Sequence, residues 1–271
     1  MPSLCTWYPI NVFSGAVAFL ILASGSPLES KNLLSAHDPD SEVDVELVLA
    51  VDISQSMDLE EQEVQRAGYV AALTSEEVLE AIRYGPLGRI AVTYVEWGGI
   101  GEQFVIADWA VVEDRATAEA FAGQIAEAPL QHRQRTSIAS ALSHAMAMVE
   151  SNRFEGIRRV VDISGDGPNN QGGAVTASRD AAMAAGITIN GLPLMMKAEK
   201  NAWQAFLHLD HYYEDCVIGG PGAFSIPVRS KEGFADAIRM KLVLEITGLQ
   251  PHDSEPIRVA GRTPVNCRLF D

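Results

Sequence analysis

Three oxygen-bearing side chains follow the first strongly apolar run of the sequence at every second position. The segment ELVLAVDISQSMD, residues 46–58, contains Asp52, Ser54 and Ser56. In an extended chain alternate side chains point to the same side, so these three oxygens face one spot. One carboxylate and two hydroxyls suit a hard cation such as Mg²⁺. Capping of a helix from Leu59 is the competing explanation, but a cap needs only one such residue.

Two later segments place further oxygen ligands where a strand or loop meets a helix. In VVDISGDGPNN, residues 160–170, Asp166 lies between two glycines, which allow a sharp turn and close backbone approach. In HRQRTSIAS, residues 132–140, Thr136 stands just ahead of a helical pattern. Taken singly, the first segment is also good turn chemistry and the second is also ordinary N-capping.

The elements that must position these side chains alternate along the chain. Apolar, β-branched runs occur at residues 43–54, 88–97, 104–112, 157–165, 186–194 and 224–230. Amphipathic helical patterns lie between most of them, at residues 59–73 with a further turn to 83, 115–127, 137–150, 174–185, 202–212 and 231–247. This alternation predicts a doubly wound, mostly parallel central sheet in an α/β fold, with helices on both faces.

One connection is too short for a helix. The runs at 88–97 and 104–112 are joined by a Gly-rich turn, so we expect a hairpin and one antiparallel strand at a sheet edge. In open α/β sheets ligands bind outside the carboxyl ends of the strands, which is where Asp52 and Asp166 fall. Asp162 lies inside its strand, and we expect it to be paired or turned away from that site.

Together these segments resemble the von Willebrand factor type A (VWA) domain and its metal-ion-dependent adhesion site. That family has an Asp-x-Ser-x-Ser triad, a Thr from a second loop and an Asp from a third, and the resemblance covers about residues 43–247. The segment DCVIGGPGAF, residues 215–224, together with the two tyrosines ahead of it, resembles an uncharacterised bacterial subfamily of such domains.

The resemblance implies a metal ligand set and a mode of binding. Ser54, Ser56 and Thr136 would offer hydroxyls to Mg²⁺, or to Mn²⁺ or Ca²⁺, while Asp52 and Asp166 would bind directly or through waters. An acidic group of a partner protein would complete the site, and the fold is not generally catalytic. Two features depart from the family: arginines at 133 and 135 in the Thr loop, and a Ser-Gly pair before Asp166.

Other functions compete with the adhesion hypothesis. A Mg²⁺-dependent phosphatase or phosphotransferase could use Asp52 as nucleophile, but the acid/base position two residues later is Ser54, which does not exchange protons near neutral pH. A serine hydrolase would need glycines flanking Ser164 on both sides. A structural module of a bacterial envelope assembly with an unused metal site also fits the sequence.

The net charge and the cysteines give two further predictions, one about partners and one about a disulfide. The chain has 20 Lys and Arg against 36 Asp and Glu, a formal charge of −16, which repels nucleic acid and anionic lipid. Cys5 would leave with a cleaved signal, so the mature chain would hold Cys216 and Cys267. In an exported protein this pair suggests a disulfide; two unrelated thiols are the alternative.

Tails flank the predicted domain. Residues 1–30 have an apolar core at 12–23 but no Lys or Arg before Lys31, and are predicted to be a secretory signal peptide; a membrane anchor at residues 10–24 is the alternative. We expect a linker at 31–42, the VWA-like domain at 43–248 and an irregular tail at 249–271. The chain is therefore predicted to be exported, periplasmic or secreted.

The histidines give a separate prediction. His132, His144, His208 and His211 are expected to lie apart, without a ligand cluster.

Overall fold

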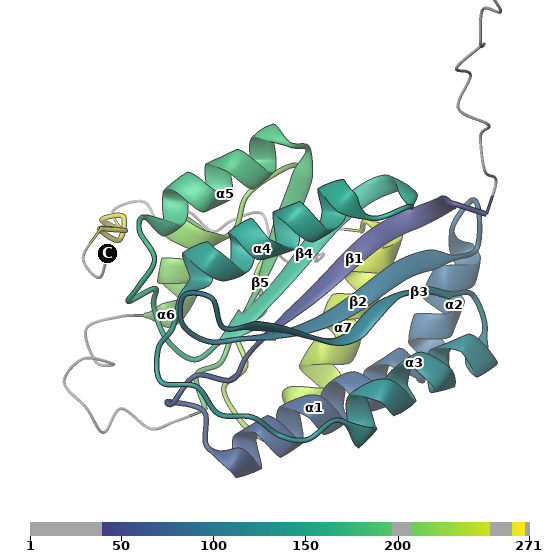
Figure 1. Cartoon of the computed structure of the whole chain (residues 1–271), viewed down its shortest axis with the longest axis horizontal. Coiled ribbons are helices and arrows are strands. Elements are labelled where there is room, and N and C mark those ends of the chain that lie inside the picture. Colours follow the sequence, from purple (N-terminus) through teal and green to yellow (C-terminus); the bar gives the residue numbers. More distant parts are fainter. Residues whose placement is uncertain (1–39, 197–207, 250–261, 269–271) are drawn as a thin grey trace, which may run out of the picture. The chain divides into compact units, whose positions relative to one another are not determined.

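A computed structural model describes residues 40–196, 208–249 and 262–268, all of which belong to one compact unit of the chain, residues 38–271. Its centre is a five-stranded sheet in the order β3-β2-β1-β4-β5 (Figure 1). The strands are β1 Glu42–Asp52, β2 Ile90–Trp97, β3 Gln103–Val112, β4 Glu155–Gly165 and β5 Ile187–Pro193. All neighbouring pairs are parallel except β2 and β3, which form the hairpin. The predicted sheet and its antiparallel edge strand are confirmed.

The central strand β1 is buried along almost its whole length, as a strand covered on both faces must be. Its last residue, Asp52, is level with Trp97 at the end of β2. On its other side Val51 pairs with Ser164, one residue before the end of β4. The three strands therefore finish at one level, which brings the loops that follow them to the same edge of the sheet.

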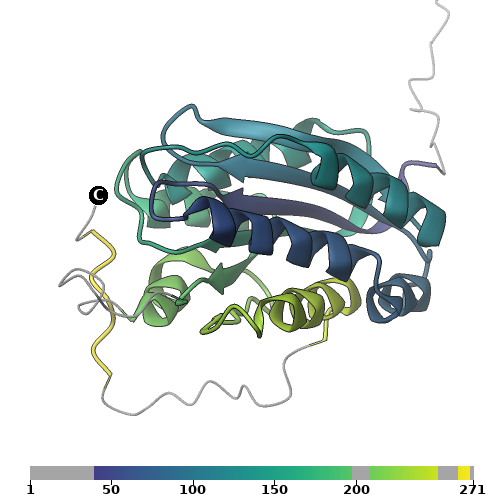
Figure 2. The same cartoon turned by 90° about the horizontal axis from the view of Figure 1, so that it is seen from below.

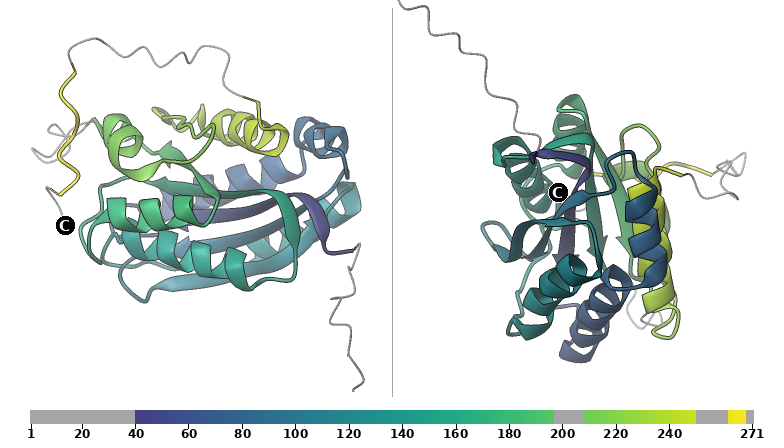
Figure 3. Two further views of the ribbon diagram at one scale, coloured as in Figure 1. Left: turned by 90° about the horizontal axis from the view of Figure 1, so that it is seen from above. Right: turned by 90° about the vertical axis from the view of Figure 1, so that its right-hand side faces the viewer.

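Helices cover both faces of the sheet. They are α1 Leu59–Leu73, α2 Glu76–Tyr84, α3 Arg115–Glu127, α4 Ile138–Ser151, α5 Val175–Ala184, α6 Leu209–Tyr212 and α7 Phe234–Thr247. One apolar core joins α1, α2, α3 and α7 to the sheet, and α1 lies beside α7 (Figure 2). A second core joins α4, α5 and the α6 region to the opposite face (Figure 3). The doubly wound arrangement is therefore confirmed.

Two predicted elements differ from those observed. The run at 224–230 is not a regular strand: it lies parallel to β5 through isolated bridges at Ser225 and Val228. The N–H groups of Ile226 and Val228 both donate to β5 or its end, so Pro227 faces away from that strand. The missing donor is Pro193 of β5, which has no N–H, so a continuous ladder cannot form. The helix predicted at 202–212 is described only from Leu209, where α6 runs into a π-helical turn, Tyr213–Val217; residues 202–207 lie outside the described residues.

A buried charge cluster fastens α7 to the sheet. The ammonium of Lys241 lies 2.7 Å from Asp162 of β4 and also pairs with Glu245 one turn later, and all three side chains are almost fully buried. Asp162 is therefore paired, as expected. Two carboxylates share one cation here, and burial together with the charge of Asp162 raises the pKa of Glu245 to about 7.

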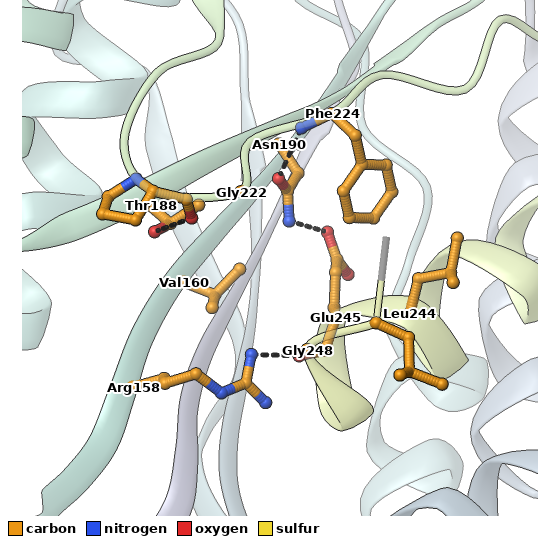
Figure 4. A pocket seen from close by; sticks show the side chains of 11 residues that line it. Arg158, Val160, Thr188, Asn190, Gly222, Phe224, Leu244, Glu245 and Gly248 are labelled. Atoms are coloured by element: carbon orange, nitrogen blue, oxygen red, sulfur yellow. Dashed lines mark hydrogen bonds between the residues drawn. The ribbon is translucent and has the colours of Figure 1, made fainter. Parts of the chain in front are cut away.

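A pocket of about 140 Å³ lies beside this cluster, between the end of α7 and strands β4 and β5 (Figure 4). Glu245 accepts a hydrogen bond from Asn190 at 3.0 Å. Arg158 donates to the main-chain carbonyls of Glu245 at 2.8 Å and Ile246 at 2.5 Å, where the negative end of the helix dipole favours a cation. The pocket is thus bounded by the groups that end α7.

Cys216 and Cys267 form a disulfide, as the sequence suggested. Cys216 in the π-helical turn is bonded to Cys267, with their Cα atoms 5.5 Å apart. Arg262 reinforces this link through an ion pair of 2.7 Å with Asp215. The expected pairing is confirmed, and it ties the described part of the tail to the domain.

The predictions for the N-terminal residues 1–39 fall outside the described residues, so the signal peptide, the anchor and the linker remain predictions. Within residues 40–196, 208–249 and 262–268, each helix is too short or too polar to span a lipid bilayer.

The raised pKa of Glu245 predicts a pH-dependent stability difference. An unfolded Glu titrates near 4.5, so between that value and about 7 the folded chain binds more protons, and stability falls as the pH rises. We expect the free energy of unfolding of Glu245→Gln, relative to wild type, to increase by about 2–3 kcal/mol between about pH 5 and pH 8. Denaturant unfolding across that range measures it.

The matched control is Glu150→Gln, which changes an exposed glutamate of α4. Its stability difference from wild type should stay flat over the same range. A flat profile for Glu245→Gln as well would show that this carboxyl does not titrate there.

Candidate metal centre

The carboxylate of Asp52 is held at the end of β1 with one oxygen bound and one oxygen unsatisfied. The side chain is fully buried. Its Oδ1 accepts a hydrogen bond of 2.7 Å from the backbone N–H of Ser54. Its Oδ2 is buried and has no hydrogen-bond partner among the described residues. Because an unpartnered buried carboxylate oxygen is costly, this atom marks a position that a cation would satisfy.

The two serines of the triad connect Asp52 to Asp166. The hydroxyls of Ser54 and Ser56 lie 3.1 Å apart. The Ser56 hydroxyl donates in turn to Oδ1 of Asp166, a residue 110 positions further along the chain. The structure therefore brings four of the five predicted ligands into one chain of contacts, with side-chain oxygens from two different loops.

Thr136, the fifth predicted ligand, is held beside these loops by main-chain bonds. The backbone N–H of Arg133 donates to the carbonyl of Ile53 at 2.9 Å, which ties the Thr loop to the end of β1. Thr136 N–H donates to the side chain of Asn170 at 3.1 Å, and Asn170 N–H returns a bond of 2.9 Å to the Thr136 carbonyl. These bonds join the Thr loop to the loop that carries Asp166.

Helix capping does not account for the predicted ligands. The N-cap of α1 is Asp58, which forms a capping box with Glu61. The N-cap of α4 is Ser137, whose hydroxyl accepts from the N–H of Ser140 at 3.2 Å. Neither cap uses any of the five residues, so the competing explanation from the sequence is wrong for both helices.

Two asparagines, Asn169 and Asn170, support the site, although the sequence analysis did not single them out. Asn169 is fully buried, and its side chain accepts from Ala139 N–H of α4 at 3.1 Å. The N–H of Asn169 donates to the Tyr212 hydroxyl at 3.1 Å. The two asparagines that follow Asp166 thus hold the Thr loop and α4 in place. Their succession after a tight turn was the available signal, because Asn favours such side-chain to backbone bonds.

The site brings two carboxyl groups together, those of Asp52 and Asp166. Burial, and next the charge of Asp166, raise the pKa of Asp52 well above its usual value, and the hydrogen bonds from Ser54 offset only part of this. Two neighbouring carboxylates repel each other unless a proton or a cation lies between them. All the available donors are oxygens, which suits a hard divalent ion. The residues present therefore fit the predicted Mg²⁺.

The two arginines of the Thr loop differ in their surroundings. Arg133 is directed at the β2–β3 hairpin, with its guanidinium 4.5 Å from the ring centre of Phe104 and 3.8 Å from Glu102. Arg135 is exposed directly before Thr136. Of the two arginines, Arg135 is the more accessible to an anionic group that approaches the site.

Two histidines that were expected to lie apart are neighbours. The rings of His208 and His211 have centroids 4.7 Å apart, and one ligand atom from each of these histidines and from Asp210 lies within 4.8 Å of the other two. The expectation was wrong because His208, the N-cap of α6, is only three residues before His211, and the turn of the chain brings the two rings together. That spacing was the signal in the sequence.

The order of the strands and the arrangement of the loops are those of the VWA fold, and comparison with known proteins supports this fold. The family model described as "Protein of unknown function (DUF1194)" matches residues 42–250, so the chain belongs to that family. This agrees with the resemblance to an uncharacterised subfamily. A search of curated proteins finds no match.

Solved VWA structures share the fold at low sequence identity. The pilus adhesin SpaC from Lactobacillus rhamnosus GG aligns over 76% of this chain and 30% of its own, with 13% identity and a TM-score of 0.55. The von Willebrand factor domain of the type V pili tip protein Mfa5 from Porphyromonas gingivalis aligns over 78% and 98%, with 11% identity and a TM-score of 0.51.

A third similar structure is proximal thread matrix protein 1 from the mussel byssus, described with a zinc-occupied MIDAS motif. It aligns over 75% of this chain and 46% of its own, with 14% identity and a TM-score of 0.53. This chain thus spans less than half of SpaC and of the mussel protein. At such identities the comparisons establish the fold.

The Ser-Gly pair before Asp166 has a steric reason, which yields a prediction. A Cβ at Gly165 would lie 2.9 Å from Asp52 Oδ2 and 2.9 Å from the Tyr213 hydroxyl, both buried. We expect Gly165→Ala to lower the free energy of unfolding by about 1–3 kcal/mol, because both side chains must shift in a packed site. Chemical denaturation without added metal measures this.

Gly167→Ala is the matched control, since a Cβ there meets nothing within 4 Å. Its stability should stay within about 0.5 kcal/mol of wild type. Equal stability losses in the two variants would contradict the steric account.

Proposed function

We propose that this chain is a metal-dependent protein-binding module of the adhesion type. In this proposal Asp52, Ser54, Ser56, Thr136 and Asp166 hold Mg²⁺ at the carboxyl end of the sheet, with Mn²⁺ or Ca²⁺ as substitutes. An acidic side chain of a partner protein supplies a remaining ligand. The observation that carries the proposal is the buried Oδ2 of Asp52, unpartnered and close to a second carboxylate.

The same geometry favours binding over catalysis. A phosphoryl-transfer nucleophile must reach its substrate, whereas Asp52 is fully buried. Ser164, the nucleophile of the weaker hydrolase alternative, is buried and accepts a hydrogen bond from Gln65 at 2.8 Å. A metal above these groups would be the part of the site that a partner touches, so recognition needs no exposed nucleophile.

The proposed partner follows from charge. The chain as a whole is strongly acidic, so an acidic ligand gains nothing from its general field. A divalent ion and the exposed Arg135 would supply positive charge locally, and a carboxylate is a ligand that Mg²⁺ prefers. Similar folds in the pilus proteins SpaC and Mfa5 support a role outside the cytoplasm, in keeping with the predicted signal peptide.

The metal itself gives the first test. In calorimetry with Mg²⁺ and Mn²⁺ we expect one saturable site per chain, lost in Asp52→Asn and in Asp166→Asn. In chelator, Asp52→Asn should be at least as stable as wild type, because it removes one of two repelling charges while keeping the side-chain shape. Asp108→Asn, an exposed carboxylate of β3, is the control and should bind metal normally.

Absence of a saturable site in the wild-type chain would overturn the proposal and favour the structural-module alternative. Retention of the site in both aspartate variants would place the metal elsewhere.

The partner class has its own test. An array of peptides in which each Asp or Glu member is matched by its Asn or Gln counterpart should be bound only at acidic members, only with Mg²⁺ present, and not by Asp52→Asn. Binding that persists in chelator, or that ignores the acid-to-amide change, would contradict a metal-bridged carboxylate.

A further inference from the structure

A second group of metal ligands lies on α6, outside the oxygen-rich site. Among the residues that the structure describes, His208, Asp210 and His211 each offer one ligand atom, and these three atoms lie within 4.8 Å of one another. His208 is exposed, while the other two are partly buried. The backbone N–H of His211 donates to Asp210 Oδ1 at 2.9 Å, which fixes that carboxylate beside the imidazoles.

The ligand types distinguish this group from the adhesion-type site. Imidazole nitrogen is a borderline-soft donor that Zn²⁺, Ni²⁺ and Cu²⁺ bind well, whereas Mg²⁺ and Ca²⁺ select oxygen. Two His and one carboxylate are a known zinc ligand set, with metal to nitrogen distances of about 2.0–2.1 Å. Small rotations of the exposed His208 side chain would bring the three atoms onto one ion.

We propose that His208, Asp210 and His211 form a second, transition-metal site that takes Zn²⁺ and keeps one coordination position open to water or to a partner's side chain. The three ligands come from four consecutive residues, so the site needs no rearrangement of the fold.

An ion pair competes with the metal for one of these ligands. Arg229, on the segment beside β5, lies 2.6 Å from Asp210 Oδ2. The guanidinium is 60% exposed, so it can swing into solvent when a dication takes its place, at the small cost of a surface ion pair. Arg229 therefore weakens metal binding rather than preventing it, and its removal should strengthen binding.

The proposed site is connected to the adhesion-type site through the residues that follow it. Tyr212, next to His211, accepts from the N–H of Asn169 in the loop after Asp166. The Tyr213 hydroxyl and Asp52 Oδ2 flank Gly165 together, since a Cβ on that glycine would lie 2.9 Å from each of them. A zinc ion on α6 would therefore rigidify the layer that packs beneath the Asp166 loop.

The test must separate zinc on α6 from zinc at the oxygen-rich site. We would titrate Zn²⁺ by calorimetry into the full chain without a purification tag, carrying Asp52→Asn and Asp166→Asn. We expect one zinc per chain in this background, and binding weakened about tenfold or more by His208→Ala or by His211→Ala. His132→Ala, which changes a histidine on the Thr loop, should leave binding unchanged.

Asp210 has a matched pair of variants, because Asp210→Asn and Arg229→Ala break the same ion pair. The first should lose zinc affinity and the second should keep or gain it. Equal losses in both would overturn the role of Asp210 as a ligand. Circular dichroism in chelator confirms that each variant is folded before it is titrated.

No zinc binding in the background chain, or equal loss with His132→Ala, would overturn the second site. Either result would leave the Mg²⁺ proposal intact, since that proposal is measured on the wild-type chain with a different ion.

Discussion

Two carboxylates from different parts of the chain meet at the end of the central strand, and the arrangement around them depends on this meeting. Asp52 is delivered by β1, which is buried on both faces and fixed in register by two parallel neighbours. Asp166 comes from the loop after β4 and reaches the same place because the two strands end almost level. Like charges do not gather in a buried place without compensation. In the proposed function, the loops form a frame that keeps this charge arrangement ready for a cation.

That frame is built mainly from main-chain and amide bonds. Asn170 and Asn169 bind the Thr loop and the start of α4, and Ser137 donates its N–H to the Gly98 carbonyl at the β2–β3 turn. Such bonds fix the geometry of the loops without adding charge, so they do not change the net charge of the site. Gly165 also shapes this site, because its missing side chain leaves room for Asp52 and Tyr213 to approach.

A second buried charge cluster lies between α7 and the sheet. In this group one lysine, Lys241, pairs with two carboxylates, those of Asp162 and Glu245. Asp162 lies in β4 and Asp166 lies four residues later in the loop that follows, and the two carboxylates have different surroundings. Asp162 pairs with a lysine of α7, whereas Asp166 accepts a hydrogen bond from the Ser56 hydroxyl.

The sequence alone determined most of the fold and predicted the candidate ligand set. Alternating apolar runs and helical patterns predicted a doubly wound sheet with an antiparallel edge, and the period of two in Asp52, Ser54 and Ser56 indicated that their oxygens converge. These features are local, so each can be predicted from a few neighbouring residues. The pairing of Cys216 with Cys267 was one of two interpretations, because cysteine count gives no distance.

The tertiary structure decided what depends on residues far apart in the chain. Only the packing of α6 and its π-helical turn beneath the Asp166 loop brings Tyr213 to Gly165, 48 positions earlier in the sequence, and so explains that glycine. Only the approach of α7 to β4 pairs Lys241 with Asp162. The run at 224–230 had the composition of a strand, yet Pro193 of β5 has no N–H to donate to it, which left isolated bridges. Composition and spacing therefore fix which groups point together along one segment, while long-range packing fixes which segments meet, because that depends on the free energy of the whole core.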